Sequence, residues 1–214
     1  NAVPTGIDVN ATTGVISGTV NTVGNTYTRL TATANTTTRT AIRDVVFNIN
    51  QDTVSWVTPT ENQVISAYEY AAISNVTANA TSAAGFGVLY SANATPTGIT
   101  LNANTGLISG TPTTVGNTYA LLTATANTTS RSNTRNIIYN VNQDVVTFSN
   151  PASNNSTISL TQSVAMTNVT LAATSAAGFG VQYSVTNLPT GVSFSGNTIS
   201  GTRSEEHTSE LQSH

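Results

Sequence analysis

The chain has 214 residues and a formal net charge of −3, charged residues make up only 7% of it, and it contains no cysteine. A surface with so few charges offers no basic patch to a phosphate backbone or an anionic lipid, which disfavours nucleic-acid binding and membrane-surface binding. The lack of cysteine excludes disulfide bonds, and no apolar run reaches the length of a membrane-spanning helix. Folding therefore has to rest on apolar packing.

The chain contains an internal repeat. Pro4–Tyr27 reads PTGIDVNATTGVISGTVNTVGNTY, and Pro96–Tyr119, which begins 92 residues later, reads PTGITLNANTGLISGTPTTVGNTY. A shortened copy, PTGVSFSGNTISGT, fills Pro189–Thr202. Self-similarity at a fixed spacing is typical of a tandem array of structural units. The repeat therefore decides the domain organisation before any single motif is interpreted.

Gln51-Asp52 and Gln143-Asp144 occupy equivalent places in the repeat, and we interpret them as the joints between units. They divide the chain into an N-terminal segment (1–50), which is the C-terminal half of a sandwich, a complete central repeat (51–142), and a C-terminal segment (143–202), which is the first part of a third unit. A length of about 92 residues suffices for an independent β-sandwich. We therefore expect the sequence to be a fragment of a longer array.

Residues 203–214, RSEEHTSELQSH, break this pattern with a sudden cluster of charges. The segment resembles the in-frame translation of a common sequencing adapter, and we interpret it as non-native. Both histidines of the chain lie in it, so residues 1–202 contain no histidine, cysteine or lysine. The tail is therefore excluded from the fold prediction.

Short apolar runs separated by turn residues predict an all-β fold for the central repeat. In chain order the predicted strands are Thr53–Val57, Tyr68–Thr77, Gly87–Ala92, Ile99–Leu101, Leu107–Ser109, Tyr119–Ala126 and Asn136–Asn142. Their number and order indicate a Greek-key β-sandwich. The whole chain is thus predicted to be a tandem of immunoglobulin/cadherin-like sandwiches, one complete and two partial.

Two local features follow from the strand pattern. The stretch Phe194–Ile199 is two residues shorter than its counterpart in the central repeat. An even change of loop length keeps both strand faces in place, so a hairpin with a two-residue Gly-Asn turn is predicted there. In the strand TYALLTATAN, a β-bulge near Leu121 is predicted, because it would place Tyr119 on the same face as Leu122.

The run PxGIxxxxxTGxISGTPxxxGxxY resembles the putative immunoglobulin repeat, the dystroglycan-type cadherin-like family of bacterial surface proteins. The matching residues of the central repeat are Pro96, Gly98, Ile99, Thr105, Gly106, Ile108, Ser109, Gly110, Thr111, Pro112, Gly116 and Tyr119. The resemblance implies sandwiches in tandem on a large secreted or surface-anchored protein. Asn35 and Asn127 stand where many members carry aspartate, and this departure weakens an inference of calcium binding.

Catalysis is not expected from residues 1–202. General acid–base chemistry needs a titratable group, most often histidine or a pair of carboxylates in one cleft. A nucleophilic serine, threonine or cysteine needs a base beside it. This part of the chain has no histidine, and its few acidic residues are scattered along the sequence. We therefore predict a protein that is not an enzyme and that needs no cofactor.

The joints are a candidate site for calcium. Calcium binds six to eight oxygens, several of them anionic, and cadherin-like arrays place it between domains. Oxygen-bearing side chains gather at both joints: Asn48, Asn50 and Asp52 at the first, and Asn140, Asn142 and Asp144 at the second. Each joint brings only one carboxylate of its own. The alternative is that these residues form linkers and turns through local side-chain to backbone bonds.

Aromatic side chains could stack on sugars. Most of them recur at equivalent positions and are predicted to lie in the core: Tyr27/Tyr119, Phe47/Tyr139, Trp56/Phe148, Phe86/Phe179 and Tyr90/Tyr183. Tyr68 and Tyr70 do not recur, and on a strand they would share one face. If that face is solvated they form a ligand-binding platform; otherwise they pack at the core or an edge.

Arg39/Arg43 and Arg131/Arg135 share a spacing of four residues in successive units. They are predicted to cap the hairpin between the last two strands rather than to bind an anion.

The sequence thus predicts a non-catalytic segment of an adhesin stalk or spacer, extracellular or on a bacterial cell surface, whose neighbours are further repeats of the same chain. The alternative is an accessory module of a larger extracellular enzyme that binds a surface glycan or protein. Neither hypothesis names a ligand, since function argued from a family resemblance is an analogy.

Overall fold

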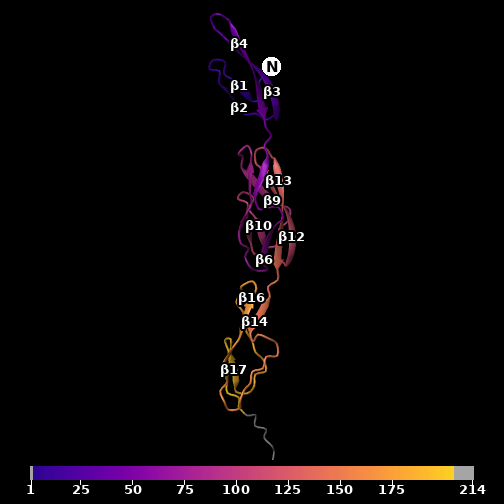
Figure 1. The fold of residues 1–214 in the computed structure, drawn as a ribbon, viewed down its shortest axis with the longest axis vertical. Coiled ribbons are helices and arrows are strands. Elements are labelled where there is room, and N and C mark those ends of the chain that lie inside the picture. Colours follow the sequence, from indigo (N-terminus) through magenta and orange to yellow (C-terminus); the bar gives the residue numbers. More distant parts are fainter. Residues whose placement is uncertain (1, 205–214) are drawn as a thin grey trace, which may run out of the picture. The chain divides into compact units, whose positions relative to one another are not determined.

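The computed structural model describes residues 2–204, so most of the adapter-like tail lies outside the described residues. Within them all regular secondary structure is β, as predicted (Figure 1). The strands are β1 (Ile7–Val9), β2 (Ile16–Gly18), β3 (Gly24–Thr33), β4 (Thr40–Ile49), β5 (Val54–Thr58), β6 (Gln63–Tyr68), β7 (Val76–Thr77), β8 (Asn79–Ser82), β9 (Val88–Ala92), β10 (Ile99–Leu101), β11 (Leu107–Gly110), β12 (Gly116–Ala126), β13 (Ser132–Asn142), β14 (Val146–Asn150), β15 (Val169–Thr170), β16 (Ala172–Ser175), β17 (Val192–Ser195) and β18 (Thr198–Gly201).

By their internal contacts the residues form two compact units. One unit holds the residues up to Ser55 together with Ala80–Val88 and Ala124–Asn133, and the other holds Trp56–Asn79, Leu89–Thr123 and the residues from Thr134 onward. The predicted division of the chain at residues 51 and 143 stays a prediction.

The N-terminal segment consists of two antiparallel pairs. β1 pairs with β2, and the longer strands β3 and β4 pair along their whole length from Gly24↔Ile49 to Thr33↔Thr40. Thr and Val are frequent in these strands, and their branched Cβ atoms fit the pleated surface of a sheet. Several apolar side chains of this segment remain exposed, Ile16 and Ile42 among them.

The central repeat contains a four-stranded sheet in the order β6-β13-β12-β9, a three-stranded sheet in the order β10-β11-β7, and the pair β5-β8. In the four-stranded sheet β6 and β13 run parallel, from Gln63↔Ile137 to Tyr68↔Asn142. The core between the sheets is apolar and consists of Ile65, Ile73, Ile99, Ile108, Ala120, Leu122, Ile137 and Tyr139. Burying one large apolar side chain contributes roughly 1.5–3 kcal/mol.

The C-terminal segment repeats part of this arrangement. β14 pairs with β16, and β15, β18 and β17 form a sheet in that order. The predicted hairpin is confirmed, because Ser195 pairs with Thr198 and leaves Gly196 and Asn197 as a two-residue turn. The hairpin predicted for the central repeat is confirmed as well, since β10 and β11 pair antiparallel.

The PTG motif requires glycine at its third position for a steric reason. Gly98 adopts a φ of +91°, and a Cβ on it would lie 2.0 Å from the carbonyl oxygen of Thr111. Gly6 and Gly191, its equivalents, meet Thr19 and Thr202 at the same distance of 2.0 Å. Only glycine permits so close an approach of two backbone segments. The motif is therefore a packing requirement of the hairpin, repeated in all three segments.

Two of the predicted strand features are wrong. The predicted strand Tyr68–Thr77 does not form as one strand: Tyr68 is the last residue of β6, Tyr70 follows in a turn with a φ of +59°, and only Val76–Thr77 at its far end form a strand, β7. The predicted bulge near Leu121 is also absent from the burial pattern, because Ala120 and Leu122 alternate without a break with outward residues. Tyr119 consequently points outward and is 70% exposed.

Candidate functional site: the aspartate joints and the tyrosine pair

Asp52, at the start of the central repeat, accepts hydrogen bonds from both side-chain and backbone donors. Ser82 Oγ and Ala84 N–H donate to its Oδ1 at 2.8 and 3.1 Å. Thr129 Oγ1 donates to its Oδ2 at 2.6 Å. Ser82 Oγ in turn accepts the N–H of Phe86 at 3.2 Å, so one carboxylate and one hydroxyl hold the whole turn of the TSAAGFG motif.

Asp144, at the start of the C-terminal segment, repeats this arrangement. Ser175 Oγ lies 2.8 Å from both of its carboxylate oxygens, and Ala177 N–H donates to Oδ1 at 2.9 Å. Phe179 N–H donates to Ser175 Oγ at 3.1 Å. The two joints thus share one local structure, and the TSAAGFG motif is explained by it: the serine hydroxyl joins the carboxylate to the turn that it caps.

The donors stabilise the charged form of both aspartates. The Thr129 hydroxyl bond, followed by those from Ser82 and Ala84, holds the pKa of Asp52 below its usual value although partial burial opposes this. The pKa of Asp144 is lowered first by the Ala177 N–H and then by the Ser175 hydroxyl. Hydrogen bonds to the ionised form always shift an acid in this direction.

These contacts bear on the calcium prediction. The carboxylates of Asp52 and Asp144 are directed at the turns of their own segments, as the alternative interpretation of linker and turn residues expects. Asn142 Nδ2 donates to the Ala67 carbonyl at 3.4 Å, and Asn50 is exposed. Across residues 2–204 no three His, Cys, Asp or Glu side chains gather as a metal-binding group. Calcium binding at the joints stays a prediction.

Tyr68 and Tyr70 flank Glu69 at the end of β6. Tyr68 is half-buried, whereas Tyr70 is 62% exposed. Tyr70 N–H donates to the Pro112 carbonyl at 2.7 Å, which fixes the turn. Because the two tyrosines lie on a strand end and a turn, they do not share a strand face as predicted. Whether they bind a ligand stays a prediction.

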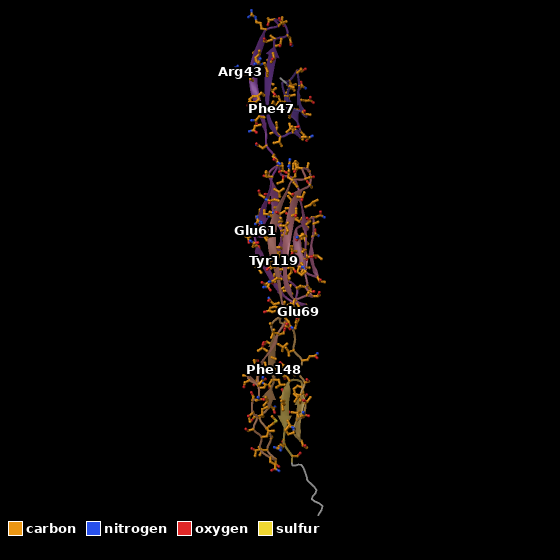
Figure 2. All side chains as sticks on the ribbon, turned by 90° about the vertical axis from the view of Figure 1, so that its right-hand side faces the viewer. Arg43, Phe47, Glu61, Glu69, Tyr119 and Phe148 are labelled. Atoms are coloured by element: carbon orange, nitrogen blue, oxygen red, sulfur yellow. The ribbon has the colours of Figure 1, made fainter. Side chains whose placement is uncertain are left out.

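Glu69 connects the same turn to the second joint. Its N–H donates to the carbonyl of Asn142 at 2.9 Å, and its Oε1 accepts the N–H of Asp144 at 3.3 Å. Glu61 and Glu69 lie before and after β6, at its two ends (Figure 2). The Glu69 carboxylate therefore holds the backbone just after the end of β13.

A cluster around Trp56 was not anticipated from the sequence. The guanidinium of Arg135 lies over the Trp56 ring, 5.8 Å from its centroid, and donates from Nη1 to the Pro59 carbonyl at 2.9 Å. Glu61 faces Arg135 at 3.5 Å. Arg135 thus packs against the sandwich through a cation–π contact rather than simply capping the last hairpin. Trp and Arg lie far apart in the sequence, so no local pattern could pair them.

The predicted core aromatics are right for some residues and wrong for others. Tyr139 and Tyr90 are buried, and Trp56 packs against the core. Burial raises the pKa of Tyr139 to about 12. Five other aromatic side chains that were predicted to lie in the core are exposed instead: Tyr27, Phe86, Tyr119, Phe148 and Phe179. Recurrence in the repeat therefore did not distinguish a buried aromatic position from an outward one.

The outward aromatic positions are themselves a repeated feature. Tyr27 pairs across the sheet with Val46, and both are exposed. Beside them, Arg29 Nε donates to Asp44 at 2.8 Å on the same outer face. Tyr119 is the equivalent residue of the central repeat and is labelled in Figure 2. In both segments a tyrosine ring is therefore presented to solvent from the strand before the last.

Residues 51–142 match the model of the family described as Putative Ig domain. The central repeat is an Ig-like domain of this family, in agreement with the resemblance seen in its PTG and ISGTP motifs. No curated protein matches the chain. Among the described residues, no helix has the length and apolar character needed to cross a membrane.

Several solved structures are partly similar to this chain. The crystal structure of mouse cadherin-23 EC22–24 is 18% identical with a TM-score of 0.38, over 94% of this chain and 72% of that one. An endo-fucoidan hydrolase of glycoside hydrolase family 107, MfFcnA4, is 18% identical with a TM-score of 0.38, over 95% and 34%. A putative alpha-galactosidase from Bacteroides fragilis is 19% identical with a TM-score of 0.34, over 41% and 18%. The chain thus spans less than a fifth of the length of that last protein.

Proposed function

We propose that this chain is a non-catalytic, load-bearing segment of an extracellular, surface-anchored protein, in which Ig-like repeats act in series as a stalk or spacer of an adhesin. The observation that carries the proposal is the parallel pairing of β6 with β13 in the central repeat. One of these strands lies near the start of the repeat and the other ends it. A pulling force on the chain therefore reaches the sheet through this pair.

The direction of the pulling force decides how strongly two parallel strands such as β6 and β13 resist being separated. β6 is pulled from its first residue, Gln63, and β13 from its last, Asn142, and these residues lie at opposite ends of the parallel ladder. The two strands are then pulled past each other, and the hydrogen bonds between them share the load. If both strands were pulled from the same end, the bonds would break one after another. A load-bearing module requires the geometry in which the strands are pulled past each other and their hydrogen bonds share the load.

The joints support the same role. Each aspartate fastens the beginning of its segment to a turn within that segment, and Glu69 fastens the backbone that leaves β13. The acidic side chains thereby serve structural contacts, which favours a non-catalytic module. An extracellular location on a bacterial surface is the setting in which tandem Ig-like repeats of this kind would carry load.

Single-molecule pulling tests the proposal. The chain has no cysteine, so the variant Asn62→Cys/Asn136→Cys offers two unique attachment points at the same end of the β6–β13 ladder, where Asn62 N–H donates to the Asn136 carbonyl at 2.8 Å. Pulling the chain by its termini is expected to give a force peak with a length gain of about 30 nm, from roughly 3.6 Å per extended residue. Pulling through the two cysteines is expected to open the ladder at a clearly lower force. Equal forces in the two geometries would refute the load-bearing role.

A second candidate function is an accessory module that binds a surface glycan or protein for a larger extracellular enzyme. Tyr70 favours it, because an exposed ring held by a backbone hydrogen bond can stack on a sugar at little cost in conformational freedom. Binding of the full chain to a glycan array that is lost in Tyr68→Ala/Tyr70→Ala and kept in Tyr119→Ala would support it. Binding that the double variant retains would rule it out.

A further inference from the structure

The outer face of the four-stranded sheet in the central repeat exposes large apolar side chains. Tyr119 in β12 is 70% exposed, and Val64 in β6 is 51% exposed. Their chain neighbours Ala120 and Ile65 are buried, so the alternation along each strand directs Tyr119 and Val64 away from the core. Exposed apolar side chains that gather on one face of a domain mark an interaction site.

The strand register brings these side chains into one row. β6 pairs with β13 so that Val64 lies opposite Ile138. β13 and β12 are neighbours, and in the turn between them the N–H of Ala126 donates to the carbonyl of Arg131 at 2.8 Å. Counting back from this bond along the two antiparallel strands places Tyr119 opposite Ile138, in the register that β3 has with β4. The row therefore crosses three strands.

The next row along the same strands is polar. Ser66 lies opposite Asn140, and Asn117 stands two residues before Tyr119 on the same side of β12. A serine hydroxyl and an asparagine amide can each donate and accept hydrogen bonds. Two residues further along β6, on the same side, lies Tyr68. We call these two rows, together with Tyr68, the tyrosine face.

The two tyrosines of this face are too far apart for one small ligand. Tyr68 lies four residues beyond the row of Tyr119, which is about 13 Å along the strands, and two strands away, which is about 10 Å across them. Their Cα atoms are thus separated by roughly 16 Å. One sugar ring cannot contact both tyrosines, whereas consecutive rings of a polysaccharide can.

The tyrosine face consists of uncharged side chains. The acidic residues that flank β6, Glu61 and Glu69, lie beyond its two ends (Figure 2). Glu61 Oε1 accepts a hydrogen bond from the Asn136 side chain at 2.7 Å, and Glu69 Oε1 accepts the N–H of Asp144 at 3.3 Å. The face itself therefore offers no Coulomb attraction to an acidic or a basic polymer, and it favours an uncharged ligand.

We propose that the tyrosine face binds an uncharged polysaccharide. Tyr68 and Tyr119 each stack on a sugar ring, and the polar row between them binds the hydroxyl groups of the intervening sugars. A tyrosine ring offers an apolar face to the C–H groups of a sugar and has few rotatable bonds to restrict. Side chains that donate and accept match hydroxyl groups, which do both. Because the groups stand on paired strands, the site is held rigidly.

This binding function is additional to the mechanical role and does not rest on it. The site also differs from the turn at Tyr70, which follows β6 and lies outside the sheet. Tyr119→Ala is expected to leave the unfolding force between the chain termini unchanged, because Tyr119 packs outside the core. The two proposals can therefore fail independently.

Native gels that contain a dissolved polysaccharide test the proposal on the full chain. The uncharged polymers are xyloglucan, galactomannan, a β-1,3-glucan and dextran, and the anionic comparison is alginate. At least one uncharged polymer is expected to retard the chain, and alginate is not. The dissociation constant from calorimetry is expected to be the same at low and at high salt, because no ion pair contributes. A chain that no uncharged polymer retards, or that alginate retards more strongly, would overturn the proposal.

Variants locate the site. Tyr119→Ala and Tyr68→Ala each remove one stacked ring and are expected to weaken binding by about tenfold. Tyr68→Phe keeps the ring and is expected to bind nearly as the wild type does. Tyr70→Ala is the matched control, since it removes a ring of the same repeat that is 62% exposed but lies off the tyrosine face. It is expected to bind as the wild type does.

Trp56 fluorescence shows whether each variant keeps the central repeat folded, because the chain has no other tryptophan. Unchanged binding by Tyr119→Ala with the repeat folded would overturn the proposal. So would a loss of binding in Tyr70→Ala as large as that in Tyr119→Ala.

Discussion

Ile108→Ala measures how far the central repeat depends on its apolar core. Ile108 lies in β11, is 0% exposed, and packs in the cluster with Ile99 and Leu122. Removing a buried isoleucine to alanine costs about 3 kcal/mol, partly through lost transfer free energy and partly through the cavity left behind. A domain of this length has a free energy of unfolding of roughly 5–14 kcal/mol. The variant is therefore expected to fold with about a third of that stability lost.

Urea denaturation followed by Trp56 fluorescence measures the loss, because Trp56 packs against the same cluster. With a slope of about 1.5 kcal/mol per M urea, the midpoint is expected to fall by about 2 M. Ile16→Ala is the matched control, since Ile16 is the repeat equivalent and is 39% exposed. Its Trp56 midpoint is expected to stay at the wild-type value. A shift below about 0.5 M for Ile108→Ala, or an equal shift for the control, would refute the reasoning.

Three further predictions concern the joints and the hairpin. First, the folded-state pKa of Asp52 and of Asp144 is lowered, so their contribution to stability is present above the unfolded pKa of about 3.9 and is lost as pH falls through the folded value. The melting temperature is thus expected to stay constant from about pH 7 to 5 and to fall below about pH 4. A melting temperature that rises on acidification would contradict this. Second, Gly98→Ala is expected to destabilise the hairpin more than Gly116→Ala, because a Cβ meets a carbonyl at 2.0 Å in the first case and nothing within 4 Å in the second; urea midpoints in the reverse order would be evidence against the steric argument. Third, since both joint carboxylates already accept hydrogen bonds, millimolar calcium is expected to leave the melting temperature unchanged relative to a chelator, whereas a rise of several degrees would establish calcium-stiffened joints.

Local patterns predicted a large part of the fold. The hairpin β10-β11 and the two-residue turn at Gly196-Asn197 were predicted correctly, because turn residues and alternating apolar positions act over a few residues. The prediction that a strand continues beyond Tyr68 was wrong, and the cause is again local. Tyr70 adopts a left-handed φ, which a tyrosine in the sequence does not indicate. The strand therefore ends although the sequence pattern still predicts β structure there.

The candidate site was predictable only in part. The two aspartates were interpreted as joint residues, but their donors lie far along the chain: Ser82 is 30 residues from Asp52, and Thr129 is 77 residues away. The repeated TSAAGFG motif was the available signal, since its serine follows the joint aspartate by 30 residues in one unit and by 31 in the next. The sequence alone gave no indication that the serine of this motif forms a hydrogen bond with the aspartate carboxylate.

The sequence by itself determined the repeat length, the all-β class and the positions of most strands, because these depend on periodicity and turn chemistry within short stretches. Only the tertiary structure decided which face of each strand is buried, as at Tyr119 and Ala120, and which distant groups meet, as at Asp52 and Arg135. The physical reason is that burial and hydrogen bonding between distant residues are properties of the packed sandwich. Alternation shows that a strand has two faces, but only the opposing sheet decides which of them becomes the core.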